Sequence, residues 1–105
     1  GGRILHVLAP GSAPPAPGEV VNADLDWARR HAHMRMHTCL HLLGSVLRFG
    51  VTGGQVGADK GRLDFDMQEE VDKEQVSAAL NALIAANHPV EPRWVDEAEL
   101  DRQPE

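Results

Sequence analysis

Apolar residues recur at helical spacing in two stretches of the chain. In the first stretch, Met36, Leu40, Leu43 and Leu47 fall at i, i+4, i+7 and i+11, which predicts a core-facing helix at about 33–48. A turn or short helix is expected before it, after Asp26. Because glycine is common just past a helix end, Gly50 is expected to close this helix.

The second helix is predicted to start after Asp72. Asp72 and Gln75 have the spacing of a capping box, and the run Asn87-His88-Pro89 provides a stop signal. Its expected apolar face consists of Val76, Ala79, Leu80, Leu83 and Ile84. A short acidic helix is predicted over 96–102.

Alternation of apolar and polar residues predicts strands in the remaining segments. The expected strands cover 3–8, 19–26, 54–58, 62–67 and 90–95, and residues 51–57 are expected to form a glycine-rich loop. Strands 3–8 and 19–26 would pair across the proline-rich loop 10–18, and Asp59-Lys60-Gly61 would form a hairpin turn. The predicted fold class is α+β, with two main helices packed on short, mostly antiparallel strands.

Composition narrows the classes of protein that this pattern allows. The 105 residues provide for one small domain or a piece of one, and the single cysteine excludes an internal disulfide or a four-cysteine zinc site. There is no apolar run of membrane-spanning length and no signal peptide, so we predict a cytoplasmic protein without a membrane partner. An aromatic content of 4% is too low for a base-stacking platform, and the net charge of −6 argues against a generally basic nucleic-acid binder, DNA included.

That net charge hides a strong asymmetry along the chain. Residues 28–48 contain four arginines (Arg29, Arg30, Arg35 and Arg48) and no acid, whereas residues 64–105 contain twelve acids and three bases. The acid-free stretch is a candidate landing site for phosphate. Alternatively, its arginines pair with the acidic C-terminal part, and the residues alone favour this structural interpretation.

His37 and His41 are the sharpest chemical feature of the sequence. At i and i+4 on a helix they lie on one face, where two imidazoles can share one Zn²⁺ at about 2.0–2.1 Å. Cys39 lies two positions from each and points away around the helix. The glutamate that follows the first histidine of a zinc protease motif is missing. On spacing alone, most such pairs are ordinary polar residues of a helix, and metal binding is the minority interpretation.

Several runs together resemble one known family. They are Asp26-Trp27-Ala28-Arg29-Arg30, the run from His33 to Leu43 with its His-Thr-x-x-His-Leu-Leu pattern, Val51 to Gly57, Lys60 to Asp66, Leu80 to Ile84 and His88-Pro89-Val90. The chain resembles the freestanding alanyl-tRNA editing proteins, relatives of the editing domain of alanyl-tRNA synthetase. The resemblance implies the fold of the threonyl- and alanyl-tRNA synthetase editing domains, incomplete at both ends.

The resemblance also implies an activity and a set of site residues. The family hydrolyses the ester that joins a wrong amino acid, serine or glycine, to the tRNA for alanine. His37 and His41 would be two zinc ligands, and Thr52 and Gln55 would contact substrate. Gly44 would give clearance for the terminal adenosine, while Arg29, Arg30 and Arg35 would meet phosphates of the tRNA backbone.

In one respect the sequence departs from the family pattern. The family completes its zinc site with a downstream Cys-x-x-x-His pair that these 105 residues do not contain. We therefore expect residues 1–26 to be a strand pair from an N-terminal barrel-like part and 27–105 to be a partial editing domain. Zinc binding should be weak or absent, the chain alone should be a poor deacylase, and exposed edges should favour self-association.

Two other functional interpretations stay open on the sequence. One is a non-catalytic tRNA-binding or assembly module that uses the same scaffold without the metal. The other is an α+β domain in which the histidine pair is purely structural. Neither interpretation predicts that removal of zinc would abolish an activity.

Overall fold

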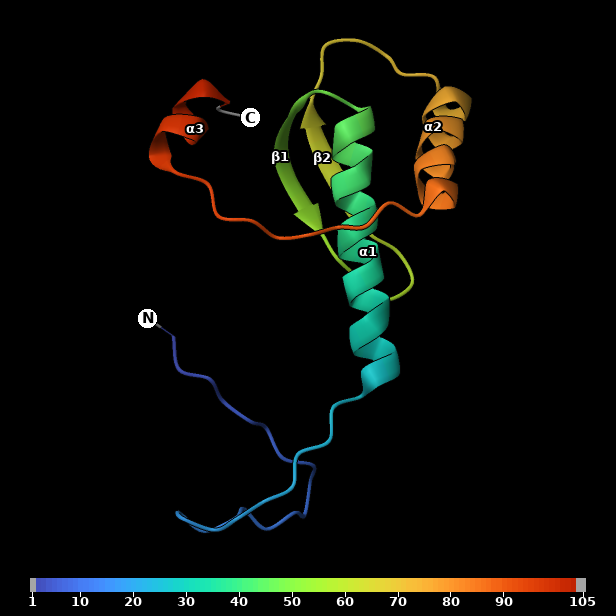
Figure 1. Cartoon of the computed structure of the whole chain (residues 1–105). Helices are drawn as coiled ribbons and strands as arrows, with labels where there is room; N and C mark the ends of the chain where they lie inside the picture. Colours follow the sequence, from blue (N-terminus) through green and yellow to red (C-terminus); the bar gives the residue numbers. More distant parts are fainter. Residues whose placement is uncertain (1, 104–105) are drawn as a thin grey trace.

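The described part of the chain, residues 2–103, forms three helices and one hairpin. The computed structural model describes residues 2–103, so Gly1, Pro104 and Glu105, which fall within the predicted segments 1–26 and 27–105, lie outside the described residues. The elements follow in the order α1 (Trp27–Val46), β1 (Gly50–Gln55), β2 (Arg62–Asp66), α2 (Lys73–Ala86) and α3 (Glu97–Arg102). The hairpin and α2 flank the C-terminal part of α1, whose N-terminal turns project beyond both (Figure 1). The α+β class and the antiparallel pairing of strands are confirmed.

Helix α1 starts earlier than its apolar stripe predicts. The Asp26 carboxylate accepts a hydrogen bond from the Arg29 backbone N–H at 3.1 Å, which caps the first turn. A separate short helix after Asp26 is therefore wrong, because the turns before residue 33 belong to α1. The helix ends at Val46 with Leu47 as its C-cap, so Gly50 does not close it but opens β1.

The predicted glycine-rich loop over 51–57 and the strand at 54–58 are corrected to one strand, β1. This strand pairs antiparallel with β2, from Gly50 opposite Asp66 to Gln55 opposite Arg62, with an irregularity between Val51 and Gly53. The strand predicted over 62–67 is confirmed as β2. Glycine lowers strand propensity, but pairing along a full partner strand outweighs that preference here.

Helices α2 and α3 follow their capping signals. The Asp72 carboxylate accepts from the backbone N–H groups of Glu74 and Gln75, at 2.8 and 3.4 Å, and Asn87 ends α2 in the left-handed region with a φ of 49°. Asp96 caps α3. The two guanidinium nitrogens of Arg93 donate to the Glu99 carboxylate, and this pairing raises the pKa of Arg93.

Three predicted strands are absent from the described residues. Segments 3–8, 19–26 and 90–95 contain no strand, and residues 2–26 run as an exposed, extended chain. A two-stranded ribbon is marginal unless a third strand or a helix covers its apolar face, and nothing covers this segment in the structure. The assignment of 1–26 to a barrel-like part stays a prediction.

The core lies where α1 meets the loop before β2. Leu40, at 9% exposure, is the one buried side chain of the described residues. The backbone at Gly61 approaches closely, since a Cβ there would lie 2.9 Å from the Met36 sulfur and 3.2 Å from Leu40 Cδ1. Many apolar side chains remain exposed, including Ile4, Val7, Val20, Leu25, Trp27 and Trp94. No helix in the described part of the chain is long and apolar enough to cross a membrane.

Candidate functional site

The histidine pair lies midway along the exposed side of α1. The Nε2 atoms of His37 and His41 are 3.0 Å apart, and one imidazole donates to the other in a direction set by their tautomers. The ring centroids are 4.7 Å apart and the planes are inclined by 47°. The i, i+4 spacing therefore brings the two predicted ligand atoms together.

A cavity of about 500 Å³ opens beside this pair, between α1 and the hairpin. Its walls include four residues singled out from the sequence, namely His37, His41, Gly44 and Gln55. They are completed by Leu40, Val51, Gly54, Val56 and Leu63. Gln55 thus lies at the same cavity as His37 and His41. A Cβ on Gly44 would meet nothing within 4 Å, so the space in front of this residue is open. Thr52, exposed on β1, does not line the cavity.

The donor pair fits one half of a zinc site. Two imidazole nitrogens bound to one tetrahedral zinc at about 2.0–2.1 Å stand roughly 3.3 Å apart, close to the 3.0 Å between the Nε2 atoms of His37 and His41. His33 precedes His37 by one turn but does not join them. Within residues 2–103, no three histidine, cysteine or acidic side chains come together to hold a metal ion. The chain thus offers two ligands at one place.

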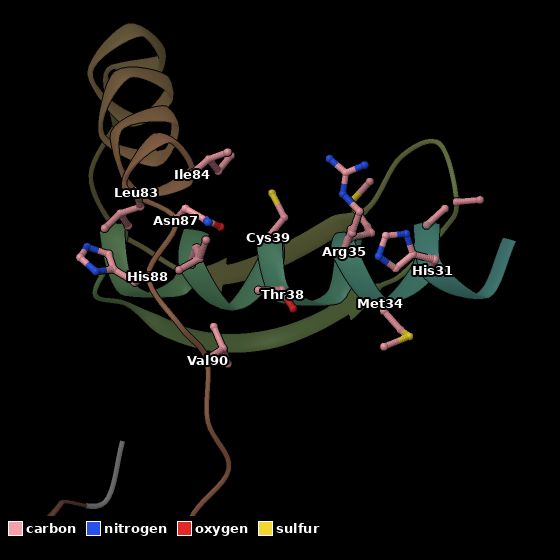
Figure 2. Close-up of a pocket in the computed structure, with 14 residues that line it drawn as sticks. His31, Met34, Arg35, Thr38, Cys39, Leu83, Ile84, Asn87, His88 and Val90 are labelled. Atoms are coloured by element: carbon pink, nitrogen blue, oxygen red, sulfur yellow. The ribbon is translucent and has the colours of Figure 1, made fainter. Parts of the chain in front are cut away.

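Cys39 faces the opposite side of α1. It lines a second cavity, of about 640 Å³, whose walls come mainly from α1, the end of α2 and the segment up to Val90. Figure 2 shows Cys39 on the side of α1 that looks toward Ile84 and Asn87. His88 lies at the end of α2 and lines this second cavity too. The prediction that Cys39 cannot join the histidine pair is confirmed by this geometry.

Among the described residues, the arginines of α1 form no ion pair with the acidic C-terminal part. Within residues 2–103, the ion pairs link Arg62 with Asp64 and Arg93 with Glu99. Arg29, Arg30 and Arg35 are exposed on α1, which contains no acidic residue. The structural interpretation of these arginines, which the residues alone favoured, is therefore wrong.

Sequence reasoning missed an aromatic contact at the start of α1. The rings of Trp27 and His31 are stacked, with centroids 5.7 Å apart and planes inclined by 20°. Trp27 keeps 61% of its surface exposed. The i, i+4 spacing of the two residues was the available signal. It was missed because the helix predicted from the apolar stripe began only at about residue 33.

Comparison with known proteins shows that the chain is similar in sequence to alanyl-tRNA editing proteins and to alanine–tRNA ligases. It is 34% identical to the alanyl-tRNA editing protein AlaX-M of Methanosarcina acetivorans over 97% of the chain and 46% of that protein. The corresponding protein of Methanosarcina mazei gives 34% over 97% of the chain and 45% of that protein. The alanine–tRNA ligase of Pyrobaculum aerophilum is 36% identical over 83% of the chain and 10% of the ligase. No family model and no solved structure matches.

An α+β segment with a histidine pair on its longest helix thus falls in the class of proteins related to alanine–tRNA ligase. More particularly, the chain is related to the freestanding alanyl-tRNA editing proteins, as its motifs predict. It spans just under half the length of the editing proteins that it matches.

Proposed function

We propose that the natural protein containing these residues hydrolyses the ester of mischarged tRNA, removing serine or glycine from the tRNA for alanine. The relatives are named for alanyl-tRNA editing, which supports this substrate class. The observation that carries the proposal is the convergence of His37 and His41 Nε2, 3.0 Å apart, at a cavity that Gln55 also lines.

In this proposal, His37 and His41 supply two ligands of a zinc ion. When bound, such an ion polarises the ester carbonyl and lowers the pKa of water, so that attack proceeds at neutral pH. Imidazole nitrogens are common zinc ligands, and the pair is already held by α1. Little conformational entropy is then lost on binding, because a helix fixes both backbones.

The cavity beside the pair supplies positioning. The Gln55 side-chain amide can donate to and accept from the aminoacyl group or the ribose, since it carries both an oxygen and an NH₂. Open space before Gly44 admits the nucleoside that bears the ester. Apolar walls at Leu40 and Leu63 limit water around the reacting ester, which strengthens polar interactions within the site.

The test is deacylation of Ser-tRNA(Ala) and Gly-tRNA(Ala) by the full-length natural protein. We expect His37→Ala to lower the rate at least a hundredfold, because it removes a ligand. His33→Ala is the matched control: it is a histidine of the same helix, one turn earlier, and outside the cavity. Unchanged activity of His37→Ala would contradict the ligand role of His37. Binding of tRNA without any deacylation by the unmutated protein would favour the non-catalytic module instead.

A further inference from the structure

An exposed stripe of side chains runs along α1 beside its core-facing leucines. Five residues at alternating spacings of three and four lie on one face of a helix, and all five are exposed: Trp27, Arg30, Met34, His37 and His41. The stripe connects the stacked Trp27 to the histidine pair. At 1.5 Å per residue, Trp27 and His37 are separated by roughly 15 Å of helix.

The chemistry of the stripe suits an unpaired nucleic-acid strand. His31 covers one side of the Trp27 ring, and the large exposed fraction of Trp27 leaves surface available for a base. Stacking on an aromatic side chain needs a base that is free of a duplex. Arg30 is a cation within one turn of that ring, where a phosphate of the same strand can reach it.

Charge around the stripe points to an anionic occupant. Arg29 and Arg30 lie in the first turn of α1, where the helix dipole disfavours cations by a few tenths of a kcal/mol or more. The nearest acid along the chain, Asp26, is engaged as the N-cap. Among the residues that the structure describes, no acidic side chain forms an ion pair with Arg29 or Arg30. Cations held in an unfavourable position and without a partner are expected where a ligand supplies the opposite charge.

We infer that the stripe is the track for the single-stranded end of an RNA substrate. The ester lies at the histidine pair, the strand follows α1 across Met34, and a base further along it stacks on Trp27 while its phosphate contacts Arg30. This inference rests on the proposed function, because that function places the ester, and so the end of the strand, at the histidine pair. The low aromatic content argues against a platform that stacks several bases. The track proposed here requires only one ring, that of Trp27, for one base.

The experiment uses the tryptophan fluorescence of the 105-residue chain. The chain has two tryptophans, so Trp94→Phe leaves Trp27 as the sole reporter. We expect short oligoadenylate to quench Trp27 at low salt. Inorganic polyphosphate and polyglutamate, which have charge but no bases, should not quench it. Quenching by these polyanions as strong as that by oligoadenylate, or no quenching at all, would overturn the inference.

Two substitutions make the test quantitative. Trp27→Leu should weaken binding of fluorescently labelled oligoadenylate roughly tenfold or more, because stacking on an aromatic ring is worth about 1–3 kcal/mol per base. Trp94→Leu, which removes a tryptophan that is 99% exposed outside α1, is the matched control and should leave the affinity unchanged. Equal losses for the two variants would contradict a specific role of Trp27.

The salt dependence tests Arg30 separately. Each phosphate neutralised on a single strand contributes about 0.7 to the slope of log K against log salt. Arg30→Ala should reduce the slope by about that amount, whereas Arg48→Ala, beyond the end of α1, should not.

If deacylation by the natural protein depends on His37 but the chain binds no oligoadenylate, the track is refuted and the proposed function stands. If the chain binds oligoadenylate but deacylation does not depend on His37, the proposed function is refuted and the track for a single strand stands.

Discussion

Zinc binding by the chain itself should be measurable and should depend on both histidines. A structural zinc site with four ligands contributes about 10–16 kcal/mol of binding free energy. Two of four ligands, already placed with Nε2 atoms 3.0 Å apart, should retain about half of it, or roughly 5–8 kcal/mol. This corresponds to a dissociation constant of about 1–200 μM. With zinc at ten times that constant, the folded chain should gain about 1.4 kcal/mol.

Isothermal titration of zinc chloride into the chain, in a buffer that does not bind metal, measures this affinity. His41→Ala should weaken binding about a hundredfold, because a single imidazole remains. His33→Ala should leave the affinity unchanged, since His33 lies one turn from His37 but outside the pair. Helicity followed by circular dichroism should show the matching stabilisation. Equal losses for His33→Ala and His41→Ala, or binding no tighter than millimolar, would refute the assignment of the pair.

Three further predictions concern the fold. Asp26→Ala should destabilise the folded chain by about 1 kcal/mol in urea denaturation through loss of the α1 cap, while Asp24→Ala, with no such bond, should change little; equal effects would contradict the capping role. Gly57→Ala should disrupt the hairpin, because its Cβ would lie 2.5 Å from the Lys60 carbonyl oxygen, and unchanged chemical shifts across β1 and β2 would contradict this. The apolar side chains exposed along residues 2–26 should cause self-association, seen in sedimentation as a mass that rises with concentration; a constant monomer mass would oppose it.

The parts of the fold that sequence predicted are those with a local signal. Helix α2 has both a period and a cap at Asp72, and the structure places the helix there. The sequence predicted helix α1 correctly over the part in which Leu40 and its apolar neighbours contact the rest of the molecule. Its first turns carry no apolar stripe, because they project into solvent, and only the cap at Asp26 marks their start.

The parts that failed depend on partners distant in sequence. Alternation in 19–26 and 90–95 describes a side-chain pattern, but strands form only where another strand supplies hydrogen bonds. Conversely, β1 forms despite three glycines among its six residues, because β2 pairs with it. The candidate site followed the same rule: the histidine spacing is local and was predicted, whereas the placement of Gln55 beside it depends on how the hairpin packs on α1.

The most direct test of the central claim is metal-dependent hydrolysis of Ser-tRNA(Ala) by the full-length natural protein under single-turnover conditions. After removal of metal with a chelator, the protein should lose deacylation and should regain it when zinc is returned. The His37→Ala/His41→Ala variant should stay inactive at the same zinc concentration. Full hydrolysis by the metal-free protein, or by this double variant, would contradict the account.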